Sequence, residues 1–78
     1  SSRELDVLHW MAQGKSNAAI ARQLEVGQET VDTYVRRIFS KMDVSDRTSA
    51  VVKGVMRGLV IASEPGIEEV IRARQPKG

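Results

Sequence analysis

A regular spacing of apolar residues between positions 28 and 42 constrains the fold of this chain more than any other feature. Apolar side chains recur there at intervals of four, three and four residues, at Val31, Val35, Ile38 and Met42. Because an α-helix advances about 100° per residue, this spacing places all of them on one side of a helix. We therefore expect a helix over residues 28–42 whose apolar side is buried against other helices.

Capping residues and shorter apolar groups predict further helices around this one. The first covers residues 3–13 and ends at Gly14, which can adopt the left-handed conformation that terminates helices. A short helix follows the cap Ser16, and another runs from the cap Asp46 to about Gly58. Because no alternating strand pattern is present, the expected fold is an all-α, four-helix bundle.

The C-terminal part of the chain is expected to form an extension of this bundle. Residues 64–66, Glu-Pro-Gly, interrupt the helical pattern. Apolar residues at helical spacing then predict a short fifth helix over residues 67–74, and residues 75–78 are expected to fray. We therefore expect a main domain over residues 1–61 and a C-terminal extension over residues 62–78.

Length and composition exclude several classes of protein. A chain of 78 residues can bury one compact core. It has no cysteine and a single histidine, His9, so we expect no disulfide, no metal site and no cofactor. No nucleophile, base and orienting group stand in a recognisable order, so we expect no catalytic residues and no enzyme. No apolar run approaches the ~20 residues that cross a bilayer, so we expect no membrane contact.

The order of the predicted elements is that of a helix-turn-helix. The second predicted helix, a turn at residues 25–27 and the third predicted helix follow one another directly, and the second helix of such a motif enters the major groove of DNA. The net charge is only +2, but residues 15–57 contain eight basic and five acidic residues. Spacing and charge alone also fit a helical bundle without nucleic-acid affinity, so both interpretations stay open at this point.

Many residues also match one known family at fixed spacings. They are Arg3-Glu4, Val7-Leu8, Ala12-Gln13-Gly14, Lys15-Ser16-Asn17-Ala18-Ala19-Ile20-Ala21, Leu24, Val26, Thr30-Val31, Tyr34-Val35, Ile38, Lys41-Met42, Val44, Arg47-Thr48 and Ala50. Over roughly residues 1–59 the chain resembles the LuxR/NarL (GerE-like) DNA-binding domain. The resemblance implies a four-helix domain whose third helix is the recognition helix and whose fourth helix pairs two protomers.

The resemblance also implies what such a chain binds and where it works. It implies sequence-specific binding of double-stranded DNA by a dimeric bacterial transcription regulator in the cytoplasm, with RNA polymerase as a further candidate partner. It also implies a receiver or ligand-sensing domain upstream, and a sequence that begins without methionine fits this expectation. The alternative from another class is a helical protein-interaction module that retains the fold without strong DNA binding.

Three residues depart from the family pattern. Asp32 stands where a basic or polar DNA-contacting residue is common, and Tyr34 replaces a frequent histidine. A carboxylate that faces phosphates weakens binding, so Asp32 favours the alternative function. Gly27 replaces the usual Ser or Thr cap of the recognition helix, which costs roughly a few tenths of a kcal/mol.

The side of the third predicted helix opposite its apolar stripe is the candidate DNA-contacting surface. It carries Glu29, Thr33, Arg36, Arg37 and Ser40. We assign base contacts to Arg36, which can bond guanine through two hydrogen bonds, and to Thr33, whose methyl group can pack on thymine. A contact with phosphate alone is the alternative for Arg36. Asp32 lies at the margin, where it can contact cytosine, pair with Arg36 four residues away or face water, and we favour the ion pair.

A second group of residues is expected to contact DNA phosphates through side chains or helix-terminal N–H groups. The phosphate candidates are Lys15, Ser16, Asn17, Thr30, Tyr34, Arg37 and Lys41. For Lys15, simple exposure to solvent is an equal alternative. Arg47 is expected to form a structural ion pair with Glu4, and Trp10 and Phe39 are expected to lie in the core.

The fourth predicted helix has more apolar surface than the core of one domain can cover. We therefore assign the dimer interface to Val51, Val52, Gly54 and Val55, with Gly54 allowing two helices to approach closely. The alternative is that residues 67–74 fold back over this surface.

Overall fold

The computed structural model describes residues 2–74 of the chain, and within them it contains helices and no strand. The helices are α1 (Ser2–Ala12), α2 (Asn17–Leu24), α3 (Gln28–Met42), α4 (Arg47–Met56) and α5 (Glu64–Arg74). The expected all-α fold, with four helices and a short fifth one, is confirmed. The expected fraying of residues 75–78 lies outside the described residues.

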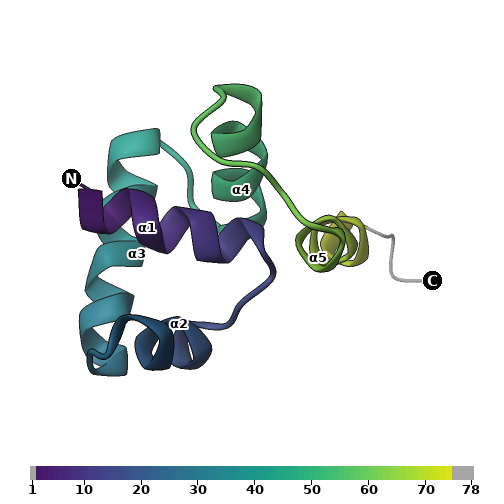
Figure 1. Cartoon of the computed structure of the whole chain (residues 1–78). Helices are drawn as coiled ribbons and strands as arrows, with labels where there is room; N and C mark the ends of the chain where they lie inside the picture. The colour runs from purple at the N-terminus through teal and green to yellow at the C-terminus, as the bar shows by residue number, and fades with distance from the viewer. Residues whose placement is uncertain (1, 75–78) are drawn as a thin grey trace.

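The helices α1 to α4 form one bundle, in which α1 and α3 each pack against the other three, and α5 lies at its edge. α3 packs against α1, α2 and α4, whereas α5 packs against α4 and α1. Figure 1 shows α5 beside α4 and the C-terminal end of α1, on the side of the bundle away from α3. The helix-turn-helix α2–α3 therefore keeps a side that α5 does not cover.

The predicted caps fix the ends of the helices in the motif. The hydroxyl of Ser16 accepts a hydrogen bond of 3.1 Å from the backbone N–H of Ala19 and so begins α2. Gly27 begins α3 without a side-chain hydrogen bond. Gly14 has a φ of +84°, in the left-handed region that glycine favours, and it lets the chain turn sharply from α1 towards α2.

The apolar stripe of α3 is the centre of the core, as its spacing predicts. Its members Val31, Val35, Ile38 and Met42 are all buried. The other buried apolar residues are Val7, Leu8, Met11, Ala12, Ile20, Ala21, Ala50, Val51 and Val60. Trp10 and Phe39 are half-buried and pack against this core, so their assignment to it is confirmed.

The start of α5 differs from the expectation. Pro65 and Gly66 were expected to precede the helix, but both lie in its first turn. Proline fits there because the first turn does not use its missing N–H, and the Ser63 hydroxyl accepts a 3.3 Å hydrogen bond from the N–H of Gly66. Gly66 is also required by packing, since a Cβ atom at this position would lie 1.8 Å from the carbonyl oxygen of Ala12. This close contact attaches α5 to the C-terminal end of α1.

Candidate nucleic-acid interface

The outward side of α3 holds the two side chains assigned to base contacts next to each other. The guanidinium of Arg36 donates a 3.2 Å hydrogen bond to the hydroxyl of Thr33, and that hydroxyl donates a 3.0 Å bond to the backbone carbonyl of Glu29. Arg36 is exposed and Thr33 is half-buried. The guanidinium therefore lies along the outer side of the helix, with the threonine beside it.

Asp32 has a different partner from the one expected. Its carboxylate accepts a 2.9 Å hydrogen bond from the side-chain amide of Asn17 at the start of α2. The expected ion pair between Asp32 and Arg36 is wrong, because Arg36 points towards Thr33 and Asp32 lies on the flank of α3 that faces α2. Asp32 thus joins the two helices of the motif.

Arg47, at the start of α4, also reaches Asn17. It donates a 2.7 Å hydrogen bond to the amide oxygen of Asn17, and it donates a second to the backbone carbonyl of Lys15. Burial lowers the pKa of the Arg47 guanidinium, and the negative charge of Glu69 acts in the opposite direction. The expected partner, Glu4, forms an ion pair of 2.8 Å with Lys41 instead, so the assignment of Arg47 to Glu4 is wrong.

These contacts form a chain of polar side chains, Asp32–Asn17–Arg47, which links α3, α2 and α4. In sequence, Asn17 is 15 residues from Asp32 and 30 residues from Arg47, and all three side chains are partly buried. Since each of these hydrogen bonds fixes one helix relative to another, the three polar side chains together hold α2 and α3 at a defined angle. Sequence reasoning predicted a separate role for each of these residues and missed that they act together.

The phosphate candidates at the start of α2 occupy different environments. Lys15 is exposed, so an anion in solution can reach its side chain. The hydroxyl of Ser16 caps α2. The side-chain nitrogen and oxygen of Asn17 are both hydrogen-bonded within the domain, so this side chain helps to position α2.

The phosphate candidates on α3 also divide into groups. Arg37 is exposed, and Thr30 is half-buried. Tyr34 is half-buried with its ring against the core. Lys41 lies in the last turn of α3, where its ion pair with the buried Glu4 partly neutralises its charge. For these residues a contact with phosphate stays a prediction. Arg37 and Lys41 are both exposed, and the ion pair with Glu4 makes Lys41 the weaker candidate.

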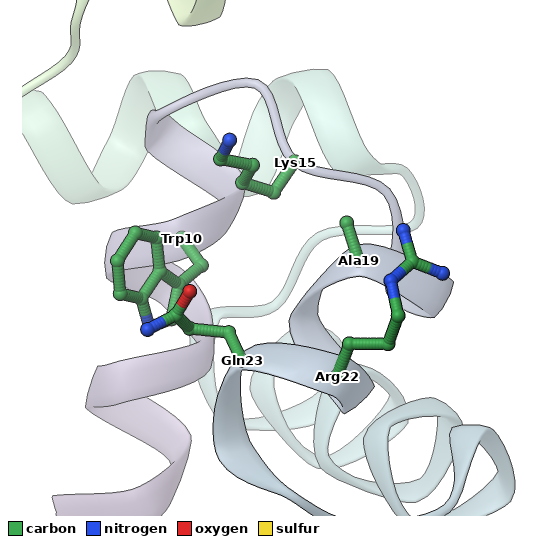
Figure 2. A pocket seen from close by; sticks show the side chains of 5 residues that line it. All are labelled: Trp10, Lys15, Ala19, Arg22 and Gln23. Carbon is green, nitrogen blue, oxygen red and sulfur yellow. The ribbon is translucent and has the colours of Figure 1, made fainter.

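A hollow of about 280 Å³ beside the motif adds one cation that the sequence did not single out. Its lining residues are Trp10, Lys15, Ala19, Arg22 and Gln23. Figure 2 shows Lys15 and Arg22 rising on either side of Ala19, while Gln23 extends towards the indole of Trp10. Arg22 thus extends the basic surface of Lys15 along α2. Its position on the outer side of the predicted second helix was the signal that could have identified it from the sequence.

The residues assigned to a dimer interface differ in how far the domain buries them. Val51 and Gly54 are buried inside the domain, and Val52 is half-buried. A Cβ atom at Gly54 would meet side-chain carbons of Leu8 and Val60 at 3.1 Å. Gly54 therefore permits close packing within one chain, which corrects its expected role between protomers. Only Val55, exposed to 42%, presents substantial apolar surface among the four.

The expected alternative, in which the C-terminal segment covers this helix, is realised in part. α5 packs beside α4, and the two helices enclose an apolar groove. The groove is lined by Val51, Val52, Val55, Met56, Ala62, Ile67, Val70 and Ile71. Met56 nevertheless remains 80% exposed at its rim, so α5 leaves apolar surface uncovered.

Residues 2–74 offer neither a metal-binding cluster nor a membrane-spanning helix. These residues contain no cluster of three or more His, Cys, Asp or Glu side chains that could hold a metal ion. None of the helices in the same part of the chain is long and apolar enough to cross a membrane.

The polar chain generates a prediction for stability. Replacing Asn17 by Ala removes both of its side-chain hydrogen bonds and leaves partly buried groups of Asp32 and Arg47 without these partners. We expect a loss of about 1–3 kcal/mol in the free energy of unfolding, measured by denaturant titration. The control is Gln23→Ala, which removes an exposed amide from the same helix. Equal losses in the two variants would contradict a role for the chain Asp32–Asn17–Arg47.

Comparison with known proteins places this arrangement in a family. Residues 1–53 match the family described as bacterial regulatory proteins, luxR family. The transcriptional regulatory protein YxjL of Bacillus subtilis is 47% identical over 60 residues, which are 77% of this chain and 28% of that protein.

Two further relatives carry more specific descriptions. The nitrate/nitrite response regulator protein NarP of Escherichia coli is 42% identical over 52 residues, 67% of this chain and 24% of its own length. The quorum sensing-dependent transcriptional regulator VjbR of Brucella ovis is 40% identical over 58 residues, 74% of this chain and 22% of its own length. The chain spans about a quarter of the length of these curated relatives. Since the family match covers more than half of its residues, this chain belongs to the luxR family of bacterial regulatory proteins, transcription regulators with a DNA-binding helix-turn-helix.

Proposed function

We propose that this domain binds double-stranded DNA in a sequence-specific manner, with α3 in the major groove, as part of a bacterial transcription regulator. The observation that carries the proposal is the outward side of α3. It presents Thr33, Arg36 and Arg37 opposite an apolar stripe that is buried in the core. The polar chain Asp32–Asn17–Arg47 supports this role because it holds α2 and α3 together.

The proposed contacts follow from the exposure and the hydrogen bonds of each side chain. Arg36 reads a base edge, most simply the two acceptors of guanine, and the Thr33 methyl group packs beside it. Lys15 and Arg37 contact phosphates, together with the N–H groups at the start of α2. Asp32 contributes by positioning α3, since its carboxylate is already bonded to Asn17.

The relatives suggest the setting in which the domain works. NarP is described as a response regulator and VjbR as a quorum sensing-dependent regulator, so we propose that this domain acts in the cytoplasm under the control of a receiver or ligand-sensing domain. Because a relative such as VjbR is described as a transcriptional regulator, RNA polymerase is a further proposed partner.

A salt titration tests the proposed function as a whole. Binding to a short duplex of random sequence is measured by fluorescence anisotropy between about 50 and 200 mM salt. Each contact with a phosphate releases counterions, so the logarithm of the binding constant should fall linearly with the logarithm of salt concentration, by about 0.9 per contact. No measurable binding at low salt would favour the alternative, a helical protein-interaction module.

A pair of arginine variants tests the assignment of base and phosphate contacts. Arg36→Ala should weaken binding to a selected site by roughly tenfold and reduce the discrimination at one base position, since a bidentate contact is worth about 1–3 kcal/mol. Arg37→Ala, a matched change at the next residue, should weaken all duplexes by a similar factor. A scan of single-base substitutions in the duplex measures both effects. If Arg36→Ala lowered the affinity of every substituted duplex equally, Arg36 would be a phosphate contact.

We further propose that two copies of the domain pair through the exposed apolar surface of α4 and α5. Val55 and Met56 form its part on α4, and Ile67 and Ile71 form its part on α5, all at least 42% exposed. One recognition helix contacts few base pairs, whereas two related by a two-fold axis can contact successive major grooves about 34 Å apart. Pairing would also remove apolar surface from water.

Met56→Glu tests this surface without disturbing the core, because Met56 is 80% exposed. A charge buried between two copies is costly, so dimerisation measured by sedimentation equilibrium should weaken at least about tenfold. Cooperative binding to a duplex with two half-sites should be lost with it. Ile61→Glu is the matched control, since Ile61 is 81% exposed and does not line the groove. Unchanged association in the Met56 variant would move the interface to another surface.

A further inference from the structure

α5 brings a negative charge to the start of α2. Glu69 lines a hollow of about 350 Å³ whose other lining residues are Gly14, Lys15, Ser16, Asn17 and Arg47. The side chain of Glu69 is 56% exposed, and its ion-pair partner Arg72 lies on α5 itself, at 3.6 Å. Its carboxylate therefore shares this hollow with two cations of the α2 and α4 starts.

The packing of α5 fixes the place of this carboxylate. Gly66 lies directly against the carbonyl of Ala12, and Val70 packs against the core. The side chain of Gln13 donates a 2.9 Å hydrogen bond to the carbonyl of Ile61, which holds the segment that leads into α5. Because α5 is attached at its first turn and along one side, Glu69, in its middle, is directed to the hollow.

The same hollow adjoins the proposed DNA-binding surface. Lys15 and the N–H groups at the start of α2 are proposed to bind phosphate there, and Asn17 connects the hollow directly to Asp32 on α3. A phosphate that approaches Lys15 therefore approaches Glu69 as well. At an ionic strength of about 0.1 M the Debye length is about 10 Å, and charges closer than this interact. The carboxylate therefore repels the phosphate and competes with it for the cations.

We infer that Glu69 lowers the affinity of the domain for DNA. Its carboxylate partly offsets the positive charges of Lys15 and Arg47 at the edge of the recognition surface, so these cations attract phosphate less strongly. This inference rests on the proposed DNA binding and adds α5, which lies beyond the residues of the family match, to the site.

The test compares Glu69→Gln with Glu68→Gln in the full chain. Both substitutions remove one negative charge from α5, but Glu68 is exposed and does not line the hollow. Affinity for a short duplex of random sequence is measured by fluorescence anisotropy at low and high salt, and circular dichroism checks the helix content. Glu69→Gln should tighten binding about two- to fivefold at low salt, as expected for one surface charge interaction, and less at high salt. Glu68→Gln should change the affinity by a clearly smaller factor.

The outcomes separate this inference from the proposed function. Equal tightening in both variants would show an effect of net charge alone, and weaker binding by Glu69→Gln would show that the carboxylate supports the site by orienting Arg47. Either result overturns the inference while DNA binding stands. Binding by Glu69→Gln where the wild type binds none would support it. Absence of DNA binding in all three forms at low salt would overturn the proposed function, and the inference with it.

Discussion

Burial of one side of α3 is the interaction on which the rest of this structure depends. The stripe from Val31 to Met42 contacts the core, and α1, α2 and α4 all pack against the helix that carries it. Fully burying a Val, Ile or Met side chain stabilises a fold by about 1.5–3 kcal/mol, so a helix with four such buried side chains has one strongly preferred orientation. Because that orientation is fixed, the opposite side, with Arg36 and Arg37, must face outwards.

The fold could be predicted from the sequence where the physical signal is local. The 3.6-residue periodicity of α3 and the caps Ser16 and Asp46 depend on residues a few positions apart, and all of them are confirmed. The start of α5 was missed for a related reason. Pro65 and Gly66 are local signals for a turn, but proline is also accepted in a first helical turn, and only the contact of Gly66 with Ala12 favours the helix here.

The polar contacts of the site could not be predicted in the same way. Asp32 has a possible partner four residues away in Arg36, and a rule for single helices selects that pair. The fold instead brings the amide of Asn17 to it from another helix. Lys41 and Glu4 meet across 37 residues, and such a pair has no spacing from which to infer it. Which of several polar side chains become neighbours is therefore decided by the packing of the apolar residues.

α5 shows how one short helix can take part in two surfaces. Gly66 and Val70 hold it against the bundle, Ile67 and Ile71 line the apolar groove with α4, and Glu69 lines the polar hollow at the start of α2. Since neighbouring residues of a helix point about 100° apart, residues 67, 68 and 69 face three different surroundings. The proposed contribution of α5 to pairing and its proposed contribution to DNA affinity therefore reside in different side chains, so single substitutions can test one without changing the other.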